Sequence, residues 1–444
     1  MYQNLNNCYS VDILDILINM KNSIYPYLSN YLSKEEISDL KEEMDKPLKI
    51  KGLLINPRRI SPEKIMEIFT SIEPSDEFEN FFTYIKDKDH PGRNLLHSAG
   101  AYYILDPSSM LISKYLKPKD RELVLDMCAA PGGKTISYAL KNPKALIIAN
   151  DFSQKRALEL SGNIERLGIA NVIVTNYEPD YFLKSFKSYF DKIILDAPCS
   201  GTGMFRKESK MKDDWSIEKM NKLLPLQDSL LDTAYQLLTP GGVLSYSTCS
   251  FMKQEDEDRL EVLLNKYEDI NIQELPIEEG YYEGTIKGTI HIFPNLYKGE
   301  GHFVSQLVKR GTAPSLETIE RLKPFNKELN LYEFTYRNET CALPFIVRNF
   351  LDLRALRMGL KLTNRAKYAK CPLDHALSHY LDSSGSIDLS IEDALSYIKG
   401  QELKTDSKLP NSYYPVSYKR VNLGYVKKTN DKLKNCYPKG LRIR

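Results

Sequence analysis

Two cysteines stand in short motifs with small and polar neighbours, Ala197-Pro198-Cys199-Ser200 and Ser247-Thr248-Cys249-Ser250. Each motif closely follows an apolar run typical of a buried strand, residues 193–195 before the first and 243–244 before the second. In a doubly wound parallel sheet the ligand crevice lies beyond the carboxyl ends of the strands. We therefore expect both thiols in one cleft, where a thiolate can act as a nucleophile.

A lone cysteine of this kind is more often an inert, buried thiol. Two of them at neighbouring strand ends, with Asp196 directly after the first strand, favour a reactive centre. A thiolate can add to carbon 6 of cytosine and so make carbon 5 nucleophilic, while a carboxyl group near N3 stabilises the added proton. The base must also leave its stack, which favours single-stranded or opened RNA. The residues alone do not decide which cysteine attacks.

A loop of small residues follows the first predicted strand, residues 123–125. Its backbone N–H groups, at the start of a helix, suit a carboxylate or a phosphate. It is not a nucleotide phosphate loop, because Cys128 stands five positions before Gly133, where that motif requires glycine. The dinucleotide Gly-x-Gly-x-x-Gly pattern is also absent. We predict that this loop binds a cofactor through Cys128, Ala129, Ala130, Pro131, Gly132, Gly133 and Lys134.

Two further acids follow the next predicted strands. Asp151 comes just after residues 146–148, and Glu178 comes after residues 172–174. A carboxylate at such a strand end can accept hydrogen bonds from ribose hydroxyls. One acid in this place is ordinary helix capping, but two in succession predict a nucleoside pocket.

The elements that must position these residues predict an α/β protein. Apolar runs alternating with helical segments from residue 122 indicate a doubly wound, mostly parallel sheet, with Pro240-Gly241-Gly242 ending the helix before its last strand. Residues 351–360 and 387–398 are expected to be helical, and the chain from 411 to be a β-rich module. We predict a small N-terminal α+β domain (1–95), a catalytic domain (96–310), an intermediate domain (311–385) and a basic C-terminal module (386–444).

Composition narrows the class of protein. The 444 residues carry a net charge of only +2, yet residues 411–444 hold nine lysines and arginines against the single acid Asp431. Such a basic end suits nucleic acid. The seven scattered cysteines argue against a disulfide framework and favour a reducing compartment.

No membrane segment or metal site is predicted. The most apolar stretch near the N-terminus, residues 11–20, is broken by Asp12 and Asp15, and no run reaches the 18 to 20 apolar residues of a bilayer span. The histidines form no zinc pattern with the cysteines, and His375 with His379 are expected on one side of a helix. We expect a cytoplasmic protein without a metal.

Residues 126–135, 196–203 and 239–251 together resemble the Sun/Nop-type RNA 5-methylcytosine methyltransferases. The resemblance implies a Rossmann-like fold and S-adenosylmethionine as the cofactor, bound by Cys128 to Lys134, Asp151, Glu178 and Asp196. It also implies unequal roles for the cysteines, with Cys249 as the nucleophile and Cys199 as the group that assists product release. Asp196 is the expected third catalytic residue.

The resemblance reaches both ends of the chain. Residues 100–110, 301–304, 353–360, 372–377 and 423–442 are similar to the RsmF branch of the family. That branch implies 16S ribosomal RNA in the small subunit as substrate and a C-terminal PUA-like RNA-binding module. The same reaction on transfer RNA, and a catalytically silent assembly factor that binds ribosomal RNA, are the alternatives. One self-contained site makes a monomer sufficient.

Overall fold

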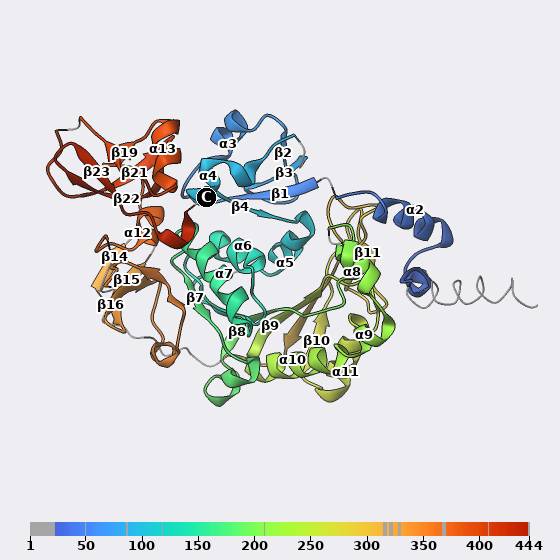
Figure 1. Ribbon diagram of the computed structural model, residues 1–444. Helices are drawn as coiled ribbons and strands as arrows, with labels where there is room; N and C mark the ends of the chain where they lie inside the picture. The colour runs from blue at the N-terminus through green and yellow to red at the C-terminus, as the bar shows by residue number, and fades with distance from the viewer. Residues whose placement is uncertain are drawn as a thin grey trace, which may run out of the picture.

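The computed structural model describes residues 23–442, apart from 49, 86–87, 118, 208, 314–317, 319–322, 327–329, 366–369 and 407. The apolar stretch at 11–20 and Arg444 of the basic end lie outside the described residues. Within them the strands form four sheets, and Figure 1 shows the largest at the centre of the molecule.

The N-terminal sheet is antiparallel, in the order β2-β3-β1-β4. Its strands are β1 (Ile50–Ile55), β2 (Ile72–Pro74), β3 (Phe81–Ile85) and β4 (Tyr102–Leu105). The helices of this region are η1 (Tyr25–Asn30), α2 (Lys34–Met44), α3 (Pro62–Ile68), η2 (Pro91–Arg93) and α4 (Leu95–Ser98). Ser33 begins α2 through a reciprocal capping box with Glu36, which satisfies two backbone N–H groups at the helix start.

The central sheet is mixed, because five parallel strands are extended at both edges by antiparallel ones. The parallel strands run in the order β7-β6-β5-β8-β9, so the strand order reverses between β5 and β8. Their bounds are β5 (Leu123–Asp126), β6 (Leu146–Asn150), β7 (Val172–Thr175), β8 (Phe190–Asp196) and β9 (Leu238–Thr248). The edge strands are β10 (Ile270–Gln273), β11 (Tyr282–Glu283), β12 (Ile290–Ile292), β13 (His302–Lys309) and β17 (Arg357–Met358). The predicted doubly wound fold is confirmed.

Alternate residues of these strands enter two different cores, as the two-residue period of a strand dictates. Leu123 and Leu125 join one buried cluster, and Val124 between them joins the other. The first face is covered by η4 (Pro179–Lys184), α10 (Leu224–Leu237) and α11 (Glu257–Lys266), and the second by η3 (Pro107–Met110), α5 (Leu111–Tyr115), α6 (Gly133–Lys141) and α7 (Gln154–Arg166). The short helices η5 (Thr202–Met204), α8 (Ser209–Asp214) and α9 (Ile217–Asn221) complete the region.

The predicted helix stop at Pro240-Gly241-Gly242 is wrong. Helix α10 ends at Leu237, and these residues lie inside β9, which begins at Leu238. Here the pairing of β8 with β9 shifts register, and Gly241 has a φ of 80°. Glycine accepts this backbone conformation without strain, so the three residues form an irregularity within the strand.

The intermediate segment forms a sheet in the order β14-β15-β16-β18. Its strands are β14 (Lys323–Asn326), β15 (Leu331–Tyr336), β16 (Glu339–Leu343) and β18 (Leu360–Lys361). The helix predicted over residues 351–360 is wrong: a short η6 (Arg348–Asp352) is followed by β17, which pairs with β7 of the central sheet. Pairing with an open sheet edge and burial of Met358 outweigh the local helical pattern.

The C-terminal sheet has the order β19-β21-β22-β23-β20. The elements are β19 (Ile387–Asp388), α13 (Ile391–Ile398), β20 (Leu403–Lys404), β21 (Tyr413–Tyr418), β22 (Val421–Thr429), β23 (Lys432–Asn435) and η7 (Lys439–Leu441). The predicted β-rich end is confirmed, and most of the helix expected at 387–398 is present as α13. As predicted, His375 and His379 share a helix, α12 (His375–Tyr380).

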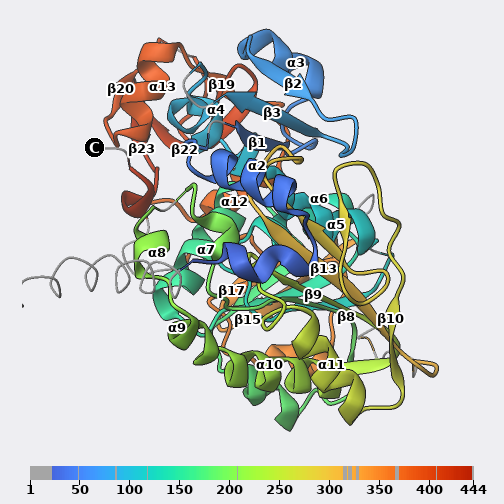
Figure 2. The ribbon, with the colours of Figure 1, turned by 90° about the vertical axis from the view of Figure 1, so that its right-hand side faces the viewer.

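The N-terminal sheet lies beside the C-terminal sheet (Figure 1, Figure 2), and the apolar side chains of the two regions share one core. Arg59 joins them by donating hydrogen bonds to the backbone carbonyls of Ala99, Asn422 and residues of α12. No helix among the described residues is both long and apolar enough to cross a membrane. The domain boundaries stay predictions, and β17 links the predicted intermediate domain to the central sheet.

Candidate active site

The two cysteine loops meet at the carboxyl ends of β8 and β9. Strand register sets Asp196 opposite Ser247, and the Sγ atoms of Cys199 and Cys249 are 3.0 Å apart. The N–H of Gly203 donates to the carbonyl of Cys249, which fixes one loop against the other. The hydrogen bond with Cys249, followed by burial, raises the pKa of Cys199 well above its ordinary value. Cys199 therefore keeps its proton and can donate it toward the sulfur of Cys249.

Glu255, which the sequence analysis did not single out, holds both loops. Its fully buried carboxylate accepts hydrogen bonds from the N–H and the hydroxyl of Ser200 and from the hydroxyl of Ser250. Gln227 donates a further bond at 3.1 Å. Because each serine follows one of the cysteines, Glu255 positions both thiols at once.

Asp196 lies beside the thiols and is ionised. Lys134 Nζ is 2.6 Å from Oδ2, and the Ser247 hydroxyl donates to Oδ1 at 2.9 Å. Burial opposes ionisation, but the charge and hydrogen bond of Lys134 and the bond from Ser247 outweigh it and lower the pKa of Asp196. This carboxylate can therefore accept hydrogen bonds from a base that carries a proton on N3.

His302 belongs to the segment 301–304, for which the sequence predicts no catalytic role. Its Nε2 lies 3.8 Å from Asp196 Oδ1 and has no hydrogen-bond partner among the described residues. Burial and the charge of Lys134 lower its pKa to about 3, so the ring is neutral. Its place at the start of β13, which pairs with β9, is what brings it to the cysteines.

The predicted cofactor loop lines the same cavity of about 420 Å³ as both cysteines and Asp196. Gly132 begins α6 with a φ of 115°, and a Cβ there would approach Leu160 Cδ1 to 2.8 Å. Glycine is thus required for the turn. The first turn of α6 leaves backbone N–H groups for an anion. Burial raises the pKa of the Cys128 thiol, which disfavours its thiolate.

Asp126 supplies an unused acceptor in the cavity. It ends β5, is 1% exposed, and accepts one bond from the Thr135 hydroxyl at 2.6 Å. Its other oxygen has no hydrogen-bond partner in the part of the chain that the structure describes, and burial raises the pKa of Asp126 to about 7. This oxygen and the start of α6 line one cavity, which suits a ligand with an ammonium and a carboxylate, such as an amino acid.

Asp151 and Glu178 do not line the cavity with the cysteines. Asp151 is buried beneath the loop, where it accepts a hydrogen bond from the N–H of Ala130 at 3.3 Å and pairs with Arg156. Glu178 lines a neighbouring cavity of about 450 Å³ with Phe152, whose side chain is 52% exposed. The structure therefore separates the predicted acids into one that supports the loop and one that faces solvent.

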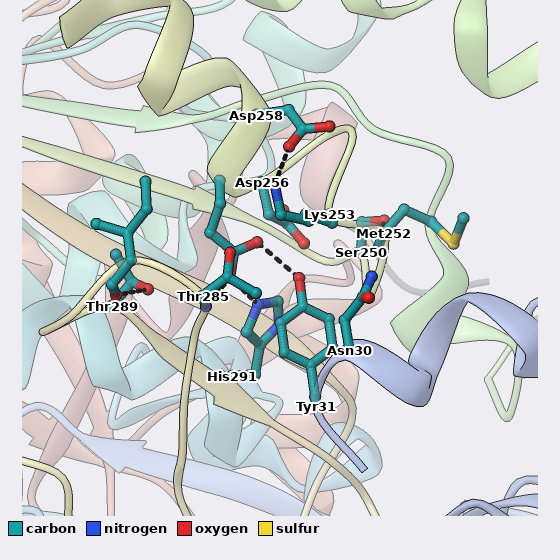
Figure 3. A network of polar contacts seen from close by, with 12 residues as sticks. Asn30, Tyr31, Ser250, Met252, Lys253, Asp256, Asp258, Thr285, Thr289 and His291 are labelled. Carbon is teal, nitrogen blue, oxygen red and sulfur yellow. Dashed lines mark hydrogen bonds and ion pairs between the residues drawn. The ribbon is translucent and has the colours of Figure 1, made fainter.

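A buried polar network lies behind the Cys249 loop (Figure 3). Glu257 accepts hydrogen bonds from the Tyr31 hydroxyl at 2.7 Å, from Thr285 N–H at 2.9 Å and from His291 Nε2 at 3.0 Å. Burial opposes ionisation, yet the electrostatic interaction and hydrogen bond with His291 and the hydrogen bond from Tyr31 lower the pKa of Glu257 to about 2. Asp256, Glu257 and His291 have the residue types of a metal site, but donors from the protein occupy both oxygens of Glu257. We interpret the network as a support that ties the N-terminal region to this loop.

Residues 113–308 match the family model described as 16S rRNA methyltransferase RsmB/F, and residues 384–443 match the RsmF PUA domain. A relative from Shewanella amazonensis, named ribosomal RNA small subunit methyltransferase F, is 30% identical over 89% of this chain and 92% of its own. One of the same name from Shewanella piezotolerans is 29% identical over 95% and 96%.

Solved structures agree in fold. A methyltransferase homolog from Pyrococcus horikoshii is 27% identical, with a TM-score of 0.57, over 68% of this chain and 99% of its own. NSun6 from the same organism, solved with SFG, has a TM-score of 0.58 at 20% identity over 65% and 98%. Two matched domains, relatives that span nearly the whole length and the shared fold all agree: the chain belongs to the RsmF family of small-subunit ribosomal RNA methyltransferases.

Proposed function

We propose that this chain transfers a methyl group from S-adenosylmethionine to carbon 5 of a cytosine in 16S ribosomal RNA, through a covalent bond between Cys249 and carbon 6. The observation that carries the proposal is the contact of the two thiols, 3.0 Å apart, in one cavity with Asp196 and the loop. Family membership supplies the ribosomal RNA as substrate class.

The two thiols differ in how strongly they hold a proton, and this difference supports Cys249 as the nucleophile and Cys199 as the group that assists release. Cys199 holds its proton because Cys249 accepts its hydrogen bond and because the site is buried. Cys249 then adds to carbon 6, and the proton that its thiol gives up reaches N3 of the ring through solvent. Asp196, held ionised by Lys134, accepts hydrogen bonds from that N3–H and from the exocyclic amine.

The residues present fit the cofactor. When bound, S-adenosylmethionine supplies the methyl group that carbon 5 accepts. The first turn of α6 and the free oxygen of Asp126 suit its carboxylate and ammonium, and Phe152 and Glu178 suit its nucleoside. Asp151 acts through Ala130 and Arg156 in this arrangement, and its contact with ribose stays a prediction.

The last steps free the enzyme. Water takes the proton from carbon 5, and release of the N3 proton then expels the Cys249 sulfur from carbon 6, which gives 5-methylcytosine. Cys199, hydrogen-bonded to that sulfur, donates its proton to it, regains one from solvent and so assists release.

The test is a pair of cysteine variants with in vitro transcribed 16S ribosomal RNA and labelled cofactor. Cys249→Ala abolishes transfer, and Cys199→Ala accumulates an enzyme–RNA adduct that survives a denaturing gel. Cys341→Ala, which removes a buried thiol in β16 outside this cavity, is the control and retains turnover. Full turnover by Cys249→Ala, or methylation at a position other than carbon 5, overturns the proposal.

A further inference from the structure

A second cavity lies where the segment before α12 meets the C-terminal sheet. Its volume is about 330 Å³, and its lining includes Lys370, Tyr425, Cys436, Lys439 and Arg442. It shares no lining residue with the cavity that holds Cys199 and Cys249. The proposed reaction gives it no role.

The charge of this cavity has one sign. Lys370, Lys439 and Arg442 contribute three cations, and none of the described lining residues is an aspartate or a glutamate. Within the described part of the chain, none of the three forms an ion pair with a carboxylate. Asp374 lies near Cys371 and Tyr425 but is not among the lining residues. Cations gathered in the wall of a hollow attract an anion, and a phosphate is the anion that lysine and arginine together bind best.

A buried hydroxyl points to a ligand independently of the charges. Tyr425, on β22, is 4% exposed, and its hydroxyl has no hydrogen-bond partner in the described part of the chain. A buried hydroxyl without a partner is costly, so its retention in a cavity wall calls for a partner from outside the chain. Tyr437 adds an aromatic wall, held edge-on to His375 with the ring centroids 5.2 Å apart.

We propose that this cavity binds one nucleotide of the RNA, with the phosphate held by Lys370, Lys439 and Arg442 and the base or ribose hydrogen-bonded to the Tyr425 hydroxyl. The inference rests on the proposed function in one respect, that the substrate is an RNA. Three cations, a free hydroxyl and an aromatic wall match the parts of a nucleotide, and the volume is at the lower end for ligand pockets. The cavity thus anchors the strand at a distance from the cysteines.

Charge reversal tests the phosphate contacts by filter binding of 16S ribosomal RNA at several salt concentrations. Lys370→Glu/Lys439→Glu weakens binding by at least about tenfold and lowers the salt slope by about two, because two phosphate contacts are lost. The matched control is Lys404→Glu/Lys408→Glu, which changes two exposed lysines of the same module outside the cavity. It weakens binding less than about threefold. Equal losses in both double variants overturn the proposal.

Tyr425→Phe removes only the hydroxyl. RNA affinity falls about three- to tenfold, as expected for one hydrogen bond. The melting temperature of the free protein does not fall, because the hydroxyl has no partner to lose. Unchanged RNA affinity overturns the proposal.

The thiol of Cys436 reports on occupancy, because it lines the cavity and is partly exposed. RNA protects Cys436 from alkylation by iodoacetamide, read by peptide mass spectrometry, whereas millimolar cytidine monophosphate does not. Protection by the free nucleotide alone overturns the assignment to an RNA strand. The protein could bind RNA through this cavity and yet form no 5-methylcytosine. That result contradicts the proposed function and leaves this inference intact.

Discussion

The catalytic cavity and the cavity beside the C-terminal sheet contain the same kinds of reactive side chain in opposite surroundings. In the first, Cys199 and Cys249 lie among Asp126, Asp196 and Lys134, so cations and carboxylates are mixed. In the second, Cys371 and Cys436 lie among cations without a carboxylate in the described lining. The presence of two neighbouring cysteines alone therefore does not show whether their thiols are catalytic.

The neighbours set the protonation of each thiol. The pKa of Cys199 is raised by the hydrogen bond with Cys249, by burial and by nearby carboxylates. The pKa of Cys436 is lowered by a hydrogen bond from Cys371, with Lys370 and Lys427 adding to the effect. The catalytic cavity of the free protein thus restrains thiolate formation, and a positively charged cofactor entering it would favour the thiolate.

The largest expected difference between the cavities comes from removing one cation in each. Lys134→Met breaks the ion pair with Asp196 and lowers kcat by about 10²- to 10³-fold, because Asp196 loses the cation that holds it ionised beside the thiols. Lys439→Met raises KM for RNA and changes kcat little. Steady-state kinetics of both variants measure kcat and KM. Equal losses in kcat would contradict the assignment of a catalytic role to one cavity and a binding role to the other.

Glu255 supplies the next effect. Glu255→Gln removes one of the two acceptor oxygens that hold Ser200 and Ser250, so the thiols lose their relative position and kcat falls by about 10²-fold. RNA affinity stays near that of the parent protein. The control is Glu261→Gln, an exposed residue of α11 outside both cavities, with unchanged kcat expected. A loss of RNA affinity equal to the loss in kcat would contradict the positioning role.

Alkylation rates compare the thiols directly. In the free protein Cys436 forms its thiolate at lower pH than Cys199, because its pKa is lowered and that of Cys199 is raised. At pH 7 iodoacetamide therefore modifies Cys436 at least about tenfold faster than Cys199. Peptide mass spectrometry over a pH series measures both. Faster labelling of Cys199 would reverse the assignment of the two environments.

The smallest effect concerns stability. The folded-state pKa of Asp126 is about 7, above the ordinary 3.8, so its burial weakens folding progressively from about pH 4 to about pH 7 and by a constant amount above that. Asp126→Asn removes this cost and, at pH 8, raises the melting temperature by roughly a few degrees. The gain in melting temperature shrinks toward pH 4. The same substitution lowers the affinity for the cofactor. A gain independent of pH would show that Asp126 is not the titrating group.

Much of the catalytic half could be predicted, because its signals are local. Residues 123–125 and 193–195 are apolar runs at strand spacing, and the loops that follow them carry the small residues and the cysteines. The glycine at 132 is explained by a backbone conformation that the sequence already suggested. The rules of the doubly wound sheet predicted which strand ends lie next to one another.

The remainder depends on contacts between distant residues. Glu255 and His302 reach the thiols through loop packing and through β13, whose pairing no local pattern indicates. Residues 351–360 show a helical pattern, but two of them form β17, which pairs with the open edge of the central sheet at β7. The cavity at Tyr425 combines segments before α12 with the end of the chain, so only the folded arrangement reveals it.

Strand β17 also sets an order of assembly. It completes the edge of the central sheet beside β7, yet it follows most of the intermediate sheet in the chain. While the protein is synthesised, the hydrogen-bonding groups of β7 on that side stay open until residues 357–358 have left the ribosome. A fragment ending near residue 310 keeps all the catalytic residues but has an unpaired edge, and it is therefore prone to aggregate.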